Sequence, residues 1–272
     1  MLECDYSSLN PTAAPSASCP SWHGACKPDG MTWSILARDP ETGELGAAVA
    51  TKFFAVGALC LRVEGRLGAV ASQALVNPML REKALDGLRA GGGAGEVLAA
   101  VTAGDPGREA RQLHILAAAG GTEGGSARHT GSGCVGWAGH VAGPDVSVAG
   151  NMLAGPRVVE ATRDAFLATA GQPMAERLLL ALEAGQAEGG DKRGRQSAAL
   201  LVASRDPYPD LDIRVDDHPD PLAELRRLHA VSRGHFALFR RFMAGHDENG
   251  REHPGVFDRA VLNAAIEKAQ GA

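Results

Sequence analysis

The chain has 272 residues and a formal net charge of -5, a length that suits one large domain or, less readily, two small ones. Hydrophobic residues make up 44 % and aromatic residues only 4 %, so a full core is available but must be built from Ala, Val and Leu. The mild acidity, the scattered Lys and Arg residues and the lack of a long apolar run argue against a nucleic-acid partner and against a membrane-spanning helix.

Residues 1–30 differ in character from the rest of the chain. They are rich in Ser, Pro and Ala, have no hydrophobic period, and lack the basic and apolar regions of a signal peptide. We expect either a disordered leader or a start assigned too early, with the true start at Met31.

From Met31 onward, apolar periodicity and turn residues divide the chain into strands and helices. In chain order the predicted elements are strands 32–38, 45–52, 58–63 and 67–72, helices 79–90 and 94–103, strands 111–118, 126–130 and 145–151, helices 155–169 and 173–187, strands 197–203 and 210–215, and helices 220–231, 233–244 and 255–269. The links between successive strands are short, which favours antiparallel hairpins, and two helix pairs need two sheet faces to cover. The sequence therefore predicts an α+β fold, a four-layer αββα sandwich of two mainly antiparallel sheets over residues 31–231, followed by a helical C-terminal extension over 232–272.

An ordered series of motifs resembles one known family. The motifs are MTWSILARDPETGELGAAVATKF, GAVASQALVNP, HTGSGCVGWAGH, AGNMLAGP, GGDKRGRQSAALL and RVDDHPDPLAEL. Together they resemble the domain of unknown function 1028 family over about residues 31–231. That family is placed in the Ntn-hydrolase superfamily, so the resemblance implies an Ntn-hydrolase-like, proteasome-like αββα fold.

The start of the first strand is also similar to bacterial proteasome-like peptidases, which open Met-Thr, lose the Met and use the freed Thr as nucleophile. The resemblance implies this role for Thr32. A Thr hydroxyl needs a base to take its proton, and an α-amino group on the same residue titrates at about pH 7.7–8, so it is partly neutral at cellular pH. With residues 1–30 attached, Thr32 has an amide instead, so activity requires cleavage between Met31 and Thr32. The alternative is that Thr32 is an ordinary β-branched strand residue.

A proteasome-like site also keeps a Lys near the Thr hydroxyl. The matching place here falls near residues 58–60, which are not basic. Lys52 and Arg62 are the nearest cations, and each is a candidate for the site or an ordinary solvated charge at a strand.

Other candidate site residues follow from their places at strand ends. The backbone of Ser72 and Gln73 is a candidate oxyanion hole, and the Gln73 side chain a candidate partner for a substrate amide. Asn151 lies between a strand and a helix, where other Ntn amidases place an oxyanion-hole Asn. In the loop that begins at Asp191, this carboxylate is a candidate to orient the amine, and Arg193 to clamp a substrate carboxylate. The alternatives are a polar turn at residues 72–73, an ordinary Gly-Asn turn at Asn151, and a charged, solvated loop after Gly190.

The HTGSGCVGWAGH segment offers a competing interpretation. His129, Cys134 and His140 are soft ligands within 12 residues, and with His114 they would complete a zinc set. Their spacing matches no zinc motif, so we expect no metal and no cofactor, and a place for His140 in the wall of a substrate pocket.

The sequence thus predicts an N-terminal-nucleophile amidohydrolase with Thr32, Asn151 and Asp191 as catalytic residues and a small amide or peptide-like compound as substrate. The alternative is a non-catalytic ligand-binding or assembly protein on the same fold. The five cysteines are odd in number and include no CxxC pair, which is typical of a reduced, cytoplasmic protein. Homo-oligomers are expected because this superfamily often assembles.

Overall fold

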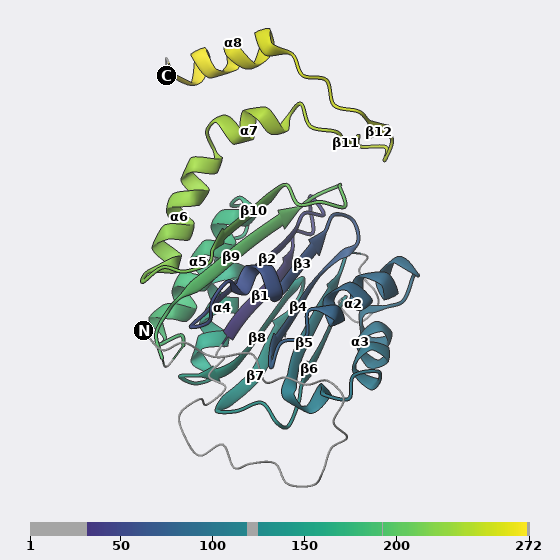
Figure 1. Ribbon diagram of the computed structural model, residues 1–272, viewed down its shortest axis with the longest axis vertical. Helices are drawn as coiled ribbons and strands as arrows, with labels where there is room; N and C mark the ends of the chain where they lie inside the picture. The colour runs from purple at the N-terminus through teal and green to yellow at the C-terminus, as the bar shows by residue number, and fades with distance from the viewer. Residues whose placement is uncertain (1–31, 119–124, 192, 271–272) are drawn as a thin grey trace, which may run out of the picture.

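The structure is a computed structural model that describes residues 32–118, 125–191 and 193–270 (Figure 1). The expected leader, residues 1–30, lies outside the described residues. Within the described part, antiparallel pairing builds one sheet in the order β10-β9-β2-β1-β8-β7 and a second in the order β3-β4-β5-β6. The strands of the first sheet are β1 (Thr32–Arg38), β2 (Leu45–Thr51), β7 (Trp137–Gly143), β8 (Val146–Leu153), β9 (Ser197–Ala203) and β10 (Leu211–Val215). The strands of the second are β3 (Leu61–Glu64), β4 (Gly68–Ala74), β5 (Arg111–Ala117) and β6 (Ser126–Thr130).

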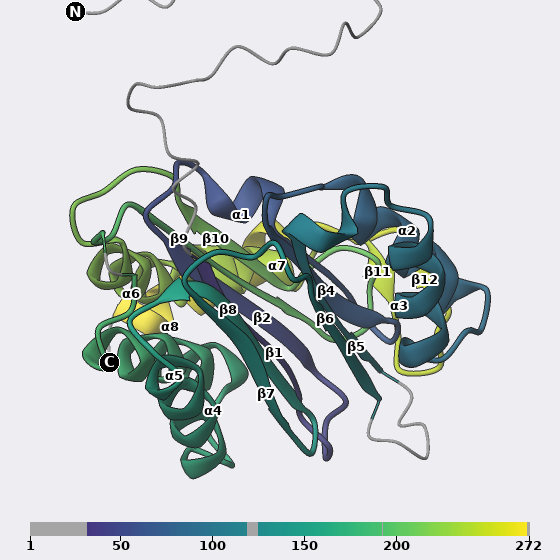
Figure 2. The ribbon, with the colours of Figure 1, turned by 90° about the horizontal axis from the view of Figure 1, so that it is seen from below.

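Helices cover the outer faces of the two sheets, which pack against each other (Figure 2). The helices are α1 (Val56–Leu59), α2 (Met79–Arg89), α3 (Ala94–Ala103), α4 (Arg157–Ala168), α5 (Met174–Ala187), α6 (Pro221–Ser232), α7 (His235–Arg240) and α8 (Arg259–Gln270). Helices α4, α5 and α6 cover the first sheet, and α2 and α3 cover the second. The predicted α+β sandwich of antiparallel sheets is therefore confirmed. None of the described helices has the length and apolarity needed to cross a membrane.

The alternation of β1 sends its side chains to two different places. Trp33 and Ile35 belong to the apolar cluster under α4 and α5, while Leu36 belongs to the cluster between the sheets. Because Thr32 and Ser34 have the same parity as Leu36, their side chains also face the second sheet. The first residue of the described chain is thus directed into the space between the sheets.

The space between the sheets has an apolar half and a polar half. The apolar half is a cluster of small and branched residues that includes Leu36, Leu45, Ala47, Val49, Val63, Ala69, Leu116 and Leu201. The polar half consists of buried side chains on the same strand faces: Thr32, Ser34, Thr51, Gln73, Gln112, His114, Ser147 and Asn151. Buried polar groups must be hydrogen-bonded to be tolerated, so this half of the interior is built for specific contacts rather than for packing alone.

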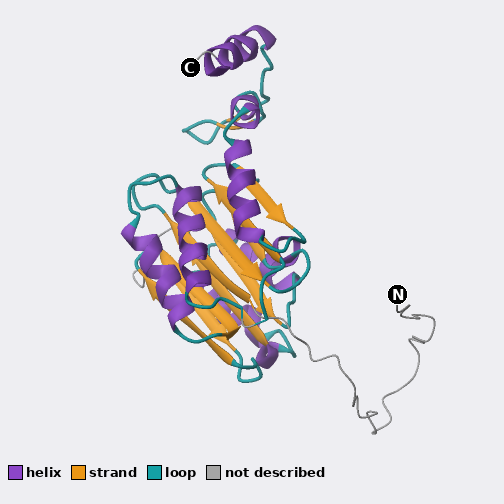
Figure 3. Cartoon of the chain, turned by 90° about the vertical axis from the view of Figure 1, so that its left-hand side faces the viewer, coloured by secondary structure: helices purple, strands orange, loops and turns teal. Residues whose placement is uncertain are grey.

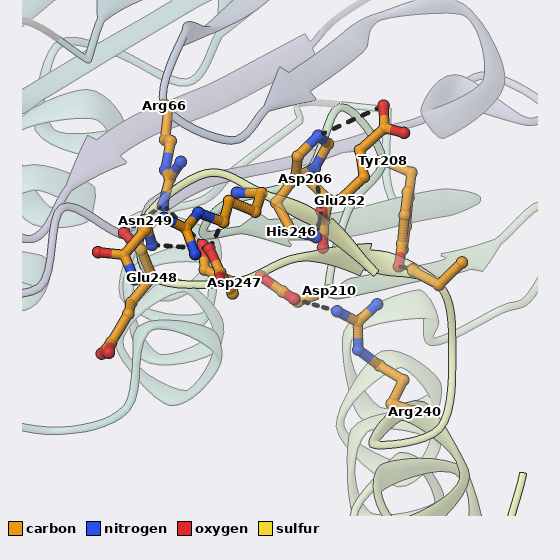
Figure 4. Close-up of polar contacts among 12 residues, drawn as sticks. Arg66, Asp206, Tyr208, Asp210, Arg240, His246, Asp247, Glu248, Asn249 and Glu252 are labelled. Carbon is orange, nitrogen blue, oxygen red and sulfur yellow. Dashed lines mark hydrogen bonds and ion pairs between the residues drawn. The ribbon is translucent and has the colours of Figure 1, made fainter. Parts of the chain in front are cut away.

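The C-terminal extension leaves the body after α6 and continues through α7, the short strand pair β11 (Gly245–His246) and β12 (Glu252–His253), and α8 (Figures 1 and 3). Polar contacts fix it to the loop between β9 and β10, as Figure 4 shows. Arg240 pairs with Asp210, and the Asp206 carboxylate accepts from the backbone N–H of His246 and contacts His246 Nδ1, both at 2.8 Å. The predicted helix over 233–244 is accordingly shorter than expected, because the chain turns back to make these contacts.

Two local predictions were wrong. The strand predicted over 58–63 begins too early, because its first two residues belong to helix α1. Ala55 adopts a left-handed backbone conformation before this helix, and the buried Arg81 guanidinium donates to the carbonyl oxygens of Ala58 and Leu61, both at 3.1 Å. The strand β7 was missed because its sequence is rich in Gly and its pairing with β8 is irregular between Trp137 and Gly139.

Candidate functional site

A pocket of about 320 Å³ opens at the end of the sandwich where β1 begins. Its walls come from β1, α1, β4, the segments before β5 and β7, and the end of β8. Most of the lining is apolar, and the mouth carries the exposed side chains of Phe53, Leu75 and Val135, which are 43 %, 60 % and 53 % accessible. The remaining lining residues are Thr32, Val56, Leu59, Cys60, Ser72, Gln73, Ala74, Val76, Ala110, Gly133, Cys134, Asn151 and Met152.

Thr32 lies in the wall of this pocket because of strand register. On one side it pairs with Thr51 of β2, and on the other with Asn151 of β8. All three side chains are buried, and the Thr32 and Thr51 hydroxyl oxygens are 3.2 Å apart. The Thr32 hydroxyl therefore has a hydrogen-bond partner on one side and an apolar pocket on the other.

Gln112 of β5 fixes the orientation of Asn151. Its Nε2 donates to the carbonyl oxygen of Gly150 at 2.9 Å, so its Oε1 points the other way and accepts from Asn151 Nδ2 at 3.2 Å and from Gln73 Nε2 at 2.7 Å. Since a carbonyl oxygen can only accept, this chain of amides leaves no freedom to flip Gln112. Asn151 Nδ2 also lies 3.5 Å from the carbonyl oxygen of Thr32, which is a long donor–acceptor distance for its second hydrogen.

A buried Ser-His-Ser bridge continues the polar half of the interior. Ser34 Oγ donates to Gln73 Oε1 at 2.7 Å, so the same hydroxyl accepts from His114 Nε2 at 2.9 Å. His114 Nδ1 then accepts from the Ser147 hydroxyl at 3.0 Å. Burial lowers the pKa of His114 to about 3, with His140 and Arg128 acting in the same direction. The ring is therefore neutral at cellular pH and serves as a link between β1, β5 and β8.

The two thiols in the pocket wall are poor nucleophiles. Burial raises the pKa of Cys60 to about 12, and burial also raises the pKa of Cys134. Because the thiolate is the reactive form, both side chains are unreactive thiols at neutral pH.

Backbone strain gathers around the pocket. Ala74 and Met152 line it with left-handed φ angles of 68° and 55°, and Ala55, with φ 53°, immediately precedes the lining residue Val56. A residue with a Cβ in this conformation costs about 1 kcal/mol or more, and such residues cluster at functional sites. The strain thus points to this end of the molecule independently of the pocket itself.

Four of the residues predicted for the site meet at the pocket, namely Thr32, Ser72, Gln73 and Asn151. Ser72 faces the opposite side of β4 from Gln73, and its backbone N–H donates to the Cys60 carbonyl oxygen at 3.0 Å. That amide is already bonded, so of the predicted oxyanion donors the Asn151 side chain is the better placed.

Asp191 does not line the pocket but supports its edge. Its buried carboxylate accepts from the backbone N–H groups of Lys52 at 2.7 Å and Arg193 at 2.8 Å, and from Arg193 Nη2 at 3.0 Å. Burial raises the pKa of Asp191, and these bonds and the Arg193 charge oppose that rise. The bond from Lys52 holds the end of β2, next to Thr51, against the loop before β9, and the two bonds from Arg193 brace that loop.

The other predicted cations and His140 also lie away from the described pocket lining. Lys52 Nζ donates to the Arg195 carbonyl oxygen at 3.2 Å, and Arg62 faces α2, with its Nε 3.1 Å from a Glu82 carboxylate oxygen. The His140 Nδ1 is 3.3 Å from Thr130 Oγ1 on β6. The departure from proteasome-like chemistry noted in the sequence therefore remains, because no charged side chain is among the described residues that line the pocket.

The residues proposed as zinc ligands do not converge. His114 is held between two serines, His129 Nε2 is 2.9 Å from the Arg108 carbonyl oxygen, and Cys134 Sγ donates to the Arg111 carbonyl oxygen at 3.4 Å. Among the described residues no group of three or more His, Cys, Asp or Glu side chains has an arrangement that could hold a metal ion.

Sequence reasoning missed Thr51, Gln112, Ser34 and Ser147 as part of this site. The sequence feature that could have identified them is a polar residue on the strand face that otherwise carries apolar, inward-facing residues. Using this feature requires knowing which alternate residues of each strand face the other sheet, and this becomes certain only when the two sheets are placed face to face.

Comparisons with known proteins agree with the motif resemblance. The family model described as "Family of unknown function (DUF1028)" matches residues 32–225. The crystal structure of protein SPO2555 from Silicibacter pomeroyi, a protein of that family, is 35 % identical, with a TM-score of 0.71 over 79 % of this chain and 95 % of that chain. A weaker likeness, with 11 % identity and a TM-score of 0.35, is to Anbu (ancestral beta-subunit) from Yersinia bercovieri, over 74 % of this chain and 94 % of that chain. The search of curated proteins found no match. The length of the family match and the identity to SPO2555 show that the chain belongs to the DUF1028 family.

Proposed function

We propose that this protein is an N-terminal-nucleophile amidohydrolase with an Ntn-hydrolase-like αββα architecture and Thr32 as its nucleophile. One observation carries the proposal. The hydroxyl-bearing first residue of β1 lies in the wall of a 320 Å³ pocket, between a threonine hydroxyl at 3.2 Å and an oriented asparagine amide. The substrate is a small amide, and the reaction needs no cofactor.

The proposed reaction begins once the peptide bond before Thr32 has been cleaved. The Thr32 α-amine takes the hydroxyl proton as Oγ1 attacks the substrate carbonyl carbon, and the carbonyl oxygen becomes an oxyanion. Asn151 Nδ2 has one hydrogen on Gln112 and a second on the 3.5 Å contact to Thr32, and this second hydrogen stabilises the oxyanion. The carbon–nitrogen bond then breaks, the amine leaves with the proton from the α-amine, and water hydrolyses the Thr32 ester to regenerate the hydroxyl.

Intact-mass spectrometry and substitution test the proposal together. Active protein should have a chain that begins at Thr32, and Thr32→Ala should lower amide turnover by more than about 1,000-fold because the nucleophile is absent. Thr32→Ser, which keeps a hydroxyl, should retain measurable turnover. Thr42→Ala, in the exposed turn at the other end of β1, is the matched control and should behave as wild type. Full turnover by protein whose chain still continues before Thr32 would refute the mechanism.

A second candidate is a ligand-binding protein on the same fold with no turnover. It is favoured by one specific observation, which is that no charged side chain is available beside Thr32 among the described pocket residues to lower the hydroxyl pKa. In that case Thr32→Ala should bind pocket ligands as wild type does, and a titration by calorimetry would give equal affinities.

Two further parts of the proposal concern the setting of the protein. Cys60 and Cys134 are both free thiols, which supports a reducing, cytoplasmic compartment. Homo-oligomerisation is supported by apolar side chains that the C-terminal extension exposes, among them Phe236 at 43 % and Val256 at 75 % accessible. Sedimentation velocity of the full chain should show self-association that Phe236→Glu with Val256→Glu reduces. Unchanged sedimentation would remove this part of the proposal.

A further inference from the structure

We propose that the amide substrate carries an uncharged, apolar acyl group of about eight to twelve carbon atoms, which fills the 320 Å³ pocket beside Thr32. This inference rests on the proposed amidohydrolase function and names the substrate class that the pocket selects.

The chemistry of the pocket wall excludes a charged acyl group. Among the described residues that line it there is no Asp, Glu, Lys, Arg or His. A charge placed there would lose its hydration without gaining an ion partner among these side chains, and the Thr32 α-amine must be neutral to act as the base, so the transfer is strongly unfavourable. Uncharged apolar groups gain from the same transfer, because they leave water for an apolar surface.

The polar atoms of the wall are mostly occupied by partners within the protein. Ser72 Oγ donates to the Asn77 carbonyl oxygen at 3.0 Å, and Cys134 Sγ donates to the Arg111 carbonyl oxygen at 3.4 Å. The Gln73 side chain is taken up by its bonds to Gln112 and Ser34. The capacity that remains, at Thr32 and Asn151, matches a single reacting carbonyl group, so the rest of the acyl group gains nothing from being polar.

The size of the acyl group follows from the volume of the pocket. An engineered apolar cavity of about 150 Å³ holds one benzene molecule, so a pocket about twice that volume holds a chain or an arylalkyl group of about eight to twelve carbon atoms. The apolar mouth, with Phe53, Leu75 and Val135, continues the same surface outward. An apolar group can therefore enter without crossing a charged rim.

The acyl side of the substrate is assigned to the pocket by covalent chemistry. In the first step the acyl carbon becomes bonded to Thr32 Oγ1, whereas the amine leaves. The acyl group must then stay next to Thr32 until water cleaves the ester. A pocket whose wall contains Thr32 is the place where this group is held during both steps.

The first experiment measures kcat/KM for a series of acyl amides of 7-amino-4-methylcoumarin. From acetyl through hexanoyl to decanoyl, kcat/KM should rise by up to about fourfold for each added CH2 group, because each buried CH2 adds apolar contact. The 6-aminohexanoyl amide, which matches heptanoyl in length but carries a charge, should be at least about 100-fold poorer than heptanoyl. Faster turnover of the acetyl or 6-aminohexanoyl amide than of the decanoyl amide would overturn the inference while leaving the amidohydrolase proposal intact.

A substitution that narrows the pocket links the chain-length preference to this cavity. Ala110 lines the pocket and has no part in the proposed chemistry, so Ala110→Leu should move the best substrate to a shorter acyl chain. Ala99→Leu, on the exposed face of α3, is the matched control and should leave the preference unchanged. An unchanged preference in Ala110→Leu would show that another surface selects the acyl group and would overturn the inference.

A binding measurement separates failure of this inference from failure of the proposed function. Calorimetry with octanamide on Thr32→Ala protein should show binding that Ala110→Leu weakens, whether or not wild type cleaves amides. Octanamide binding with no turnover of any acyl amide would remove the amidohydrolase proposal and support the pocket's preference for an apolar acyl group. If wild type cleaves acyl amides but Thr32→Ala protein does not bind octanamide, the preference for an apolar acyl group is overturned and the amidohydrolase proposal stands.

Discussion

Lowering the pH should destabilise this protein through His114, and the structure gives the size of the effect. The histidine has a folded-state pKa of about 3 because it is fully buried, whereas a histidine in an unfolded chain titrates at about 6.5. Between these two values the unfolded state binds a proton that the folded state does not. Stability therefore falls as the pH drops below about 6.5, at about 1.4 kcal/mol per pH unit, and the loss ends near pH 3. From pH 7 to pH 5 the expected loss from His114 is about 2 kcal/mol.

The variant His114→Gln tests this value because it removes the titrating ring but keeps one donor and one acceptor for Ser34 and Ser147. Urea unfolding can be followed by fluorescence, since Trp33 is buried between the first sheet and its helices. At pH 7 the variant should be less stable than wild type, but between pH 7 and pH 5 it should lose about 2 kcal/mol less. The control is His253→Gln on the exposed strand β12, which should follow wild type. If wild type and His114→Gln lose stability in parallel between pH 7 and 5, the ring is not held neutral and the assigned hydrogen-bond directions are wrong.

Three other predictions follow from particular contacts. Ala74→Gly should stabilise the protein by about 0.5–1 kcal/mol in urea unfolding because Ala74 has a left-handed φ of 68°, whereas Ala99→Gly, in the exposed middle of α3, should cost about 1 kcal/mol. Gln112→Glu should lower stability by at least about 2–3 kcal/mol, because a carboxylate cannot donate to the Gly150 carbonyl oxygen and would be repelled by it. Amide turnover should fall as well, because a displaced side chain at position 112 no longer holds Asn151 in place, and wild-type stability in this variant would contradict the network. Arg240→Met should make residues 233–258 more sensitive to limited proteolysis. The reason is that the ion pair with Asp210 and the hydrogen bond to the Pro209 carbonyl oxygen at 3.1 Å hold the extension on the body (Figure 4). An unchanged digestion pattern would show that other contacts suffice.

The sandwich could be predicted from the sequence because its strands follow simple patterns. Short apolar segments with turns between them predicted antiparallel pairing, and the two helix pairs indicated that two sheet faces must be covered by helices. The predicted helix 220–231 closely matches α6 because its start is fixed locally: the Asp220 carboxylate accepts from the backbone N–H of Ala223 at 3.3 Å, and Pro221 is the first helical residue. What failed, at α1 and β7, depends on non-local causes: a guanidinium from α2 closes the turn at α1, and β8 supplies the pairing that makes a Gly-rich segment a strand.

The candidate site was predicted less completely than the fold, and the reason is geometrical. Thr32 and Asn151 were found because each stands at a strand end, and register then places them side by side. Lys52 and Arg62 were near in sequence, but one extends from a strand end to the Arg195 backbone and the other has the wrong parity on β3. Gln112 lies far from Thr32 in sequence and on the other sheet, so only the packing of the two sheets shows that it orients Asn151.

The division of the interior into two halves explains how one fold can hold a pocket with buried polar side chains without losing stability. In the apolar half, nearly every inward-facing residue of β2, β4 and β9 is apolar and buried. Its contribution to stability is the removal of apolar surface from water, which does not depend on the orientation of the side chains. The polar half costs desolvation, which is offset only if every amide and hydroxyl has a partner, so its geometry is strongly specified. Its hydrogen bonds run from the Ser34 hydroxyl through Gln73 to Gln112, which also accepts from Asn151, and so end at the pocket. An error at any link leaves a buried group unpaired, and this penalty is what keeps Asn151 in one orientation beside Thr32.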